Sequence, residues 1–96
     1  MLSLRLPGEK EVLLEQEKDP TLKNSEILIE IKASGLCGSD LLPYKSDKQD
    51  RKSQNPRGKL NISGHEPCGI VVETGKNING IKTGDRIIVH HYSGCR

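Results

Sequence analysis

The sequence has almost no aromatic residues from which to build a core. Among its 96 residues there is no Phe and no Trp, there are two Tyr, and hydrophobic residues make up 32% of the chain. Such a core must rest on Ile, Leu and Val, and a chain this short buries a modest share of its surface. The length fits one small domain, and we expect its stability to be low.

Long apolar runs and a strong charge imbalance are also missing. No apolar run approaches the length of a membrane span, and the N-terminus has no apolar segment of the signal-peptide kind. Fifteen basic and thirteen acidic residues are interspersed and give a net charge of +2. This balance argues against nucleic-acid or membrane partners. We therefore expect a cytoplasmic protein.

The three cysteines, Cys37, Cys68 and Cys95, are few and odd in number, which argues against a disulfide framework. There is no C-x-x-C pair, so we do not expect these cysteines alone to build a closed structural zinc site. We expect Cys68 to be a packing residue.

Short segments with the composition of β strands are spread along the chain, at residues 2–6, 11–16, 26–33, 69–75 and 86–91. In the third segment, three isoleucines alternate with Glu30 and Lys32, which is typical of a strand with one buried face. No long stretch has helical periodicity, although the run GSDLLPY favours a turn of helix. We expect a mainly β fold, a small and largely antiparallel β-barrel, closed or nearly closed, with short helical turns.

Residues 45–59 differ from the rest of the chain because they include no apolar residue and eight charged ones. We expect this segment to be an exposed and mobile loop.

Two stretches combine metal-binding side chains with turn-forming residues: GLCGSD at 35–40 and GHEPCG at 64–69. Thiolate, imidazole and carboxylate are the ligand types of a catalytic zinc site that keeps one position open. A regular strand would point His65 and Glu66 to opposite faces. The glycine before them and the proline after them would interrupt the pleat and let the pair converge. From composition and spacing alone, a small buried Cys beside surface polar residues remains the alternative.

The order of the motifs is more specific than any one of them. GLCGSD, then GHEPCGIVVETG, then KTGDRIIVHHYSGC resembles the N-terminal catalytic domain of zinc-dependent medium-chain alcohol dehydrogenases, in the sorbitol or threonine dehydrogenase-like branch. The resemblance runs from about Glu26 to Cys95. It implies a GroES-like β-barrel over residues 1–96, within a zinc-dependent, NAD- or NADP-linked enzyme. Such an enzyme would oxidise a secondary alcohol, polyol or similar small hydroxyl substrate by hydride transfer and would form a homo-oligomer.

The resemblance also implies roles for single residues. Cys37 and His65 match ligands of the catalytic zinc, and Glu66 matches a glutamate that ligates the metal or stands just behind it. Ser39 matches the hydroxyl residue that hydrogen-bonds the substrate alcohol and takes its proton. Asp40 matches a carboxylate that orients the zinc-bound imidazole. Ser39 and Asp40 also have a simpler interpretation, because Ser and Asp are preferred caps of short helices.

Some other positions match the motifs of the family, and others differ from them. Gly84, Asp85 and Arg86 match a family motif, although a turn explains them without a catalytic role. Where many relatives carry a histidine that relays the proton, this sequence has Leu42, which cannot carry one. Cys95 matches the first of four cysteines of a structural-zinc lobe, and the chain ends one residue later.

We expect this lobe and the nucleotide-binding domain to be absent, since no glycine-rich βαβ fingerprint occurs, and the chain alone to be inactive. A non-catalytic, stand-alone GroES-like barrel that acts as a binding or structural module is the alternative. A zinc-free reductase of the same superfamily is a third possibility. Cys37 and Glu66 argue against it, because such relatives have little need of both ligands.

Overall fold

A computed structural model describes residues 1–50 and 64–90 of the chain. In chain order the elements are β1 (Leu2–Gly8), β2 (Glu11–Gln16), β3 (Ile27–Gly35), the 3₁₀ turn η1 (Gly38–Asp40), α1 (Leu41–Lys45), β4 (Glu66–Thr74) and β5 (Arg86–Ile88). Contacts divide the chain into two compact units. The first comprises Met1–Lys18 and Leu36–His65, and the second comprises Asp19–Gly35 and Glu66–Arg96.

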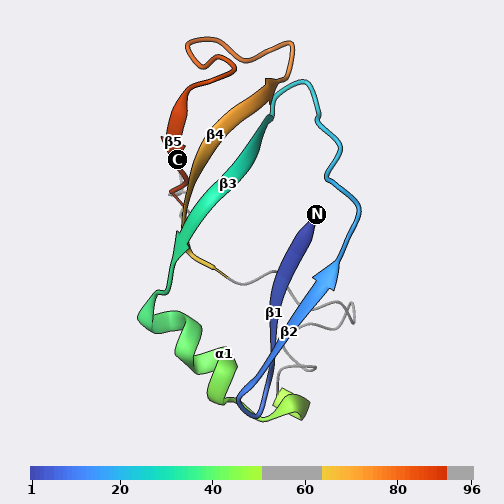
Figure 1. Ribbon diagram of the computed structural model, residues 1–96, viewed down its shortest axis with the longest axis vertical. Coiled ribbons are helices and arrows are strands. Elements are labelled where there is room, and N and C mark those ends of the chain that lie inside the picture. Colours follow the sequence, from blue (N-terminus) through green and yellow to red (C-terminus); the bar gives the residue numbers. More distant parts are fainter. Residues whose placement is uncertain (51–63, 91–96) are drawn as a thin grey trace. The chain divides into compact units, whose positions relative to one another are not determined.

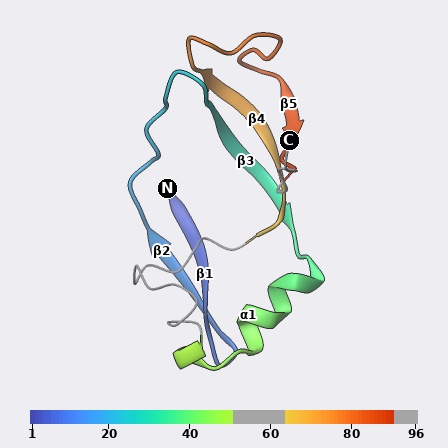
Figure 2. The ribbon, with the colours of Figure 1, turned by 180° about the vertical axis from the view of Figure 1, so that it is seen from behind.

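The mainly β class predicted from the sequence is confirmed. In the first unit β1 and β2 form an antiparallel hairpin, and in the second β4 lies between β3 and β5 in an antiparallel sheet (Figure 1, and from behind in Figure 2). A closed barrel needs an unbroken circle of paired strands. The strands of the described residues form two separate sheets instead, so the expected closure is not found there.

The strand boundaries differ from the expected ones mainly in the second unit. β4 begins at Glu66 rather than at residue 69, and β5 ends at Ile88, short of the expected end at His91. Residues 51–59 of the charged segment, together with His91 and Cys95, lie outside the described residues. In the described ranges, no helix is both long enough and apolar enough to cross a membrane.

The single buried face expected for residues 26–33 is not formed. Ile27 and Ile29 are half-buried, whereas Ile31 and the rest of β3 beyond it are exposed. The β3–β4 register shifts twice, once after Leu28 and again after Ile31. A bulge bends a strand and breaks the alternation of its faces. The regular spacing of the isoleucines therefore does not place them on one buried face.

Apolar burial is sparse in both units. Leu6 on β1 and Val71 on β4 are the buried hydrophobic residues of the described chain. Many larger apolar side chains are exposed, among them Leu14 and Ile88. This agrees with the shortage of core residues expected from the composition, and it gives polar contacts more weight.

The β1–β2 hairpin buries polar side chains while it leaves several leucines exposed. Ser3 and Arg5 are 3% and 4% exposed, whereas Leu2 and Leu14 on the opposite face are 63% and 66% exposed. The composition of residues 2–6 locates the strand correctly, but hydrophobicity alone would not select Ser3 and Arg5 as buried.

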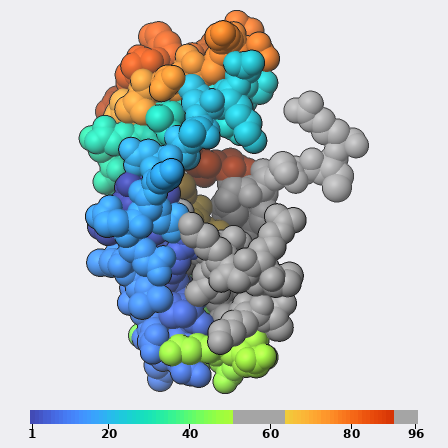
Figure 3. All heavy atoms as spheres, turned by 90° about the vertical axis from the view of Figure 1, so that its right-hand side faces the viewer, coloured from blue at the N-terminus to red at the C-terminus, as the bar shows by residue number. Residues whose placement is uncertain are grey.

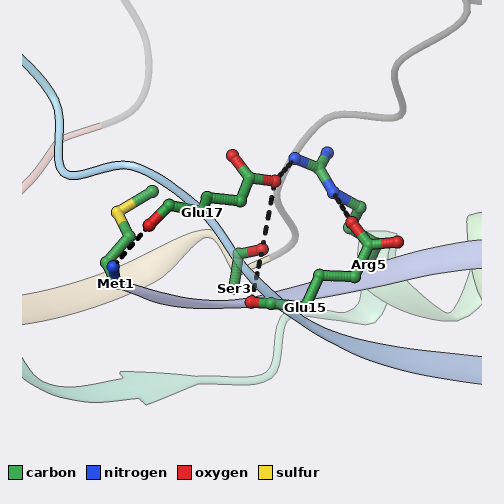
Figure 4. Close-up of polar contacts among 5 residues, drawn as sticks. All are labelled: Met1, Ser3, Arg5, Glu15 and Glu17. Atoms are coloured by element: carbon green, nitrogen blue, oxygen red, sulfur yellow. Dashed lines mark hydrogen bonds and ion pairs between the residues drawn. The ribbon is translucent and has the colours of Figure 1, made fainter.

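Charged partners explain why the polar face can be buried (Figure 4). The Nε atom of Arg5 donates a 2.9 Å hydrogen bond to Oε2 of Glu15, and the same guanidinium pairs through Nη2 with the carboxylate of Glu17. The Ser3 hydroxyl lies 3.2 Å from Glu17 Oε1, and the ammonium of Met1 donates to the Glu17 backbone oxygen at 2.6 Å. A buried guanidinium is stable only when hydrogen-bonded carboxylates compensate its lost hydration.

Arg5→Ala is therefore expected to lower the free energy of unfolding by about 3 kcal/mol, because it takes the Arg5 guanidinium away from the Glu17 carboxylate, whose side chain is only 14% exposed. Urea denaturation followed by circular dichroism measures the change. Lys32→Ala is the matched control, since Lys32 pairs with Glu30 at 2.6 Å but both side chains are about half exposed. Exposed pairs contribute roughly 0–1 kcal/mol. Equal effects of the two substitutions would contradict the assignment.

The turn between β1 and β2 adopts an unusual backbone conformation. Pairing of Gly8 with Glu11 leaves Glu9 and Lys10 as a two-residue loop, with φ angles of 51° and 60°. The left-handed region costs an L-residue roughly 1–2 kcal/mol. Type I′ hairpin turns require it at both positions and usually recruit Asn and Gly. Neither residue here is of that kind, so other contacts must hold the turn.

Those contacts come from the end of α1. The N–H of Glu9 donates to the Ser46 oxygen and the N–H of Lys10 to the Tyr44 oxygen, both at 2.7 Å. The last carbonyls of a helix have no partner within it, so the turn satisfies two of them. Beyond α1, the Lys48 ammonium lies 2.8 Å from Glu11 Oε1 and 3.6 Å from Glu9 Oε2.

The contact between the β1–β2 turn and the end of α1 also positions the helical segment. The yellow-green segment near residue 48 lies against the blue hairpin in Figure 3. The hydrogen bond with Glu11 raises the pKa of Lys48. The turn thus fixes one end of the segment formed by η1 and α1.

Lys10→Gly is expected to raise the free energy of unfolding by about 0.5–1 kcal/mol, because glycine adopts positive φ without strain while the N–H donor is kept. Lys10→Ala removes the same charge but keeps a Cβ, so it should give no such gain. Thermal and urea unfolding of both variants test this. A stabilisation shared by the alanine variant would show that charge, not backbone strain, is responsible.

The stretch TGDR forms a turn before β5. The backbone N–H of Lys82 donates to Asp85 Oδ2 at 2.9 Å, and the Lys82 ammonium lies 2.8 Å from Asp85 Oδ1. This side-chain hydrogen bond lowers the pKa of Asp85 and raises that of Lys82. Gly84 has a φ of 93° and donates to the Val71 oxygen, while the Val71 N–H donates to the Asp85 oxygen. The turn accounts for these residues, as the simpler interpretation predicted.

Candidate metal centre

Asp40 organises the local structure of the GLCGSD stretch. Cys37 has extended backbone angles and occupies the N-cap position of η1. Its N–H donates a 2.9 Å hydrogen bond to Asp40 Oδ2. A side chain that reaches back to the N-cap N–H is half of a capping box. Asp40 thus occupies the N3 position of the η1 capping box, whereas at the N-cap of α1, the role considered for it, its side chain makes no cap hydrogen bond.

The other oxygen of the same carboxylate holds His65. Asp40 Oδ1 lies 2.6 Å from His65 Nδ1, and the Asp40 side chain is 4% exposed while that of His65 is 39% exposed. Because a carboxylate oxygen accepts, this contact suits the tautomer with its hydrogen on Nδ1, in which a metal would bind through Nε2. Metal-ligating histidines commonly have their second nitrogen held by a carboxylate in this way.

The backbone is irregular just before His65. Gly64 has a φ of 112°, and Glu66 is the first residue of β4, so His65 precedes the strand while Glu66 begins it. The expected interruption by Gly64 is present. The interruption expected from Pro67 is not, because Pro67 is the second residue of β4. A proline is tolerated at a strand end, where its missing N–H is not needed, and its oxygen accepts the Val89 N–H at 3.0 Å.

The remaining candidate residues are placed as follows. Cys37 is a half-buried free thiol, Ser39 is exposed within η1, and Glu66 is exposed. Among residues 1–50 and 64–90, no three His, Cys, Asp or Glu side chains converge as a group that could hold a metal. The structure thus brings Asp40 together with His65 and with the backbone of Cys37, but it gathers no complete ligand set in those ranges. Cys68 is half-buried in β4 opposite Ala33, as suits a packing residue.

The donor chemistry fits zinc all the same. A thiol, an imidazole with its Nδ1 already held by a buried carboxylate, and a further carboxylate are the groups that catalytic zinc sites use. Sequence reasoning missed the support that the Glu9–Lys10 turn gives to this segment. Neither residue type signals positive φ, so the sequence offered no sign of it.

Comparison with known proteins identifies the family of this chain. Residues 23–96 match the alcohol dehydrogenase GroES-like domain. The chain belongs to this family, which confirms the resemblance seen in its motifs.

The individual relatives are zinc-type and related dehydrogenases. The zinc-type alcohol dehydrogenase-like protein YphC of Escherichia coli (strain K12) is 38% identical, over 99% of this chain and 28% of its own length. An L-threonine 3-dehydrogenase of Bacillus velezensis is 35% identical, over 79% of this chain and 21% of its own. The crystal structure of 2R,3R-butanediol dehydrogenase from Bacillus subtilis superposes with a TM-score of 0.76 at 28% identity, covering 93% of this chain and 27% of that one. The chain spans about a quarter of the length of these relatives.

Asp40→Ala is expected to weaken zinc binding by about 10–100-fold, because the imidazole loses the carboxylate that fixes its tautomer and orientation. Competition with a chromophoric chelator measures the affinity, and the ¹⁵N shifts of the His65 ring report the tautomer. Asp47→Ala is the matched control. The Asp47 side chain also accepts a backbone N–H, that of Gln49 at 2.6 Å, and it is exposed. An equal loss of affinity in both variants would show that Asp40 acts only as a helix cap and does not orient the imidazole for the metal.

Proposed function

We propose that this chain is the N-terminal catalytic part of a zinc-dependent, NAD- or NADP-linked dehydrogenase that oxidises a secondary alcohol, polyol or similar hydroxyl compound by hydride transfer. The observation that carries the proposal is the 2.6 Å contact between the buried Asp40 carboxylate and His65 Nδ1. Relatives named for L-threonine, sorbitol and 2R,3R-butanediol support the substrate class, since each name denotes a small hydroxyl compound.

Cys37 and His65 would hold the zinc, and Glu66 would complete the site as a third ligand or stand just behind it. When bound there, zinc would supply Lewis-acid chemistry that eases loss of the substrate's hydroxyl proton. Nicotinamide cofactor supplies the hydride acceptor. No residue of this chain is assigned to cofactor binding.

The chain's own residues orient groups and move the proton. Asp40 keeps the hydrogen on Nδ1 of His65, which leaves Nε2 as the ring's acceptor nitrogen for the metal. Ser39 lies exposed on η1, so its hydroxyl can reach a substrate and accept the alcohol proton. Leu42, on the exposed side of α1, cannot carry that proton further. Another group or water would have to take the proton from Ser39.

A non-catalytic binding module of the same fold is the second candidate. One observation favours it, namely that no three metal-binding side chains converge within the described ranges. Metal content separates the two functions, because a module without catalysis has no use for zinc.

We expect wild-type protein purified without chelators to contain about one zinc per chain, with zinc lost on Cys37→Ala or His65→Ala, because each substitution removes a ligand. Plasma mass spectrometry on protein of known concentration measures the content. Cys68→Ala is the control thiol substitution and should keep its zinc. A wild-type chain without zinc would refute the metal-dependent function, and loss of zinc in the Cys68 variant would show that thiol content rather than the site controls binding.

A further inference from the structure

The first glycine of GLCGSD lies directly across from the glutamate of GHEPCG. Gly35 and Glu66 are paired residues in the β3–β4 ladder. A Cβ placed on Gly35 would lie 2.4 Å from Glu66 Oε2 and 3.1 Å from Glu66 Cβ. The first distance is far below any normal contact between non-bonded heavy atoms. The glutamate side chain therefore folds over the glycine and occupies the space that a side chain at position 35 would need.

Backbone conformation does not explain why position 35 is a glycine. Positive φ in the described chain is found at other glycines, and Gly35 is not among them. An L-residue could adopt its backbone angles, so what position 35 requires is the absence of a side chain.

We propose that Gly35 is a positioning residue that sets where the Glu66 carboxylate lies, and hence its access to the metal centre. The inference rests on the proposed function, in which Glu66 serves the zinc. Glu66 directly follows His65, so the glycine acts on the neighbour of a proposed ligand. The group that an added Cβ would meet first is the far end of a flexible side chain. A small side chain at position 35 would therefore move the carboxylate before it moved the strands.

The same motif offers an internal comparison. Gly38 also lacks positive φ, and a Cβ placed there would meet nothing within 4 Å. Gly35 and Gly38 thus differ in whether an added Cβ would meet a neighbouring atom. Adding a methyl group at position 35 displaces a carboxylate, and adding one at position 38 displaces nothing.

Cobalt(II) titration of the full chain tests the proposal, with Co²⁺ alone as the probe and its visible d–d bands as the report on coordination. The variants are Gly35→Ala, Gly38→Ala, Glu66→Ala and the double variant Gly35→Ala/Glu66→Ala, each checked for folding by urea denaturation. We expect Gly38→Ala to match wild type. Gly35→Ala should change the cobalt spectrum and weaken binding on the order of tenfold, as loss of an outer orienting contact does. In the Glu66→Ala background, Gly35→Ala should have no further effect, because the two residues act as one unit.

Every other outcome refutes either the metal-dependent function or the positioning role of Gly35. If wild type binds neither cobalt nor zinc, the metal-dependent function fails and the positioning role fails with it. If Glu66→Ala weakens binding but Gly35→Ala does not, the function stands and the positioning role is refuted. An equal loss from Gly35→Ala with and without Glu66, no effect of Glu66→Ala at all, or unfolding of the Gly35 variant would each show that the glycine does not act through this carboxylate.

Discussion

The buried carboxylate of Asp40 is the group on which the candidate centre depends. Burial of a carboxylate costs free energy unless hydrogen bonds replace its lost hydration. Here one oxygen accepts the Cys37 N–H and the other contacts His65 Nδ1. The helix-cap and metal-site interpretations of Asp40 are thus compatible, because its two oxygens serve them separately. A single side chain thus ties the start of η1 to a histidine that lies far along the chain.

The support for that carboxylate is also polar. The hairpin turn at Glu9 and Lys10 tolerates two left-handed residues because the last carbonyls near α1 accept their N–H groups. Arg5 in the same hairpin is buried against two glutamates. A chain without Phe or Trp gains little from apolar burial, so directional contacts determine where η1 and α1 lie. The positions of η1 and α1 therefore depend on a few hydrogen bonds, and a single substitution can remove each of them.

The sequence predicted the mainly β class and the approximate places of the strands, but it did not predict register or burial. The family resemblance implied that Asp40 orients an imidazole, and this role in metal binding stays a prediction. Composition located β1 and β2, but it could not show that the face with Arg5 is buried, because the compensating carboxylates belong to Glu15 on β2 and to Glu17 just after it. The spacing of the isoleucines could not reveal the bulges in the β3–β4 ladder. Barrel closure is a property of strand pairing, which local patterns do not encode. Asp40 was assigned through the order of the motifs, since spacing alone left its helix-cap role equally open.

Two neighbouring residues in GHEPCG are oriented by different physical constraints. His65 lies before β4, and an electrostatic contact with Asp40 within the first unit orients its ring. Glu66 lies inside the strand, and a steric vacancy at Gly35 within the second unit receives its carboxylate. The contact with Asp40 is directional and fixes one ring nitrogen of His65. The absence of a side chain at Gly35 only leaves room for the Glu66 carboxylate. The ring of His65 therefore has a specific orienting partner, whereas the position of the Glu66 carboxylate depends on the missing side chain at Gly35.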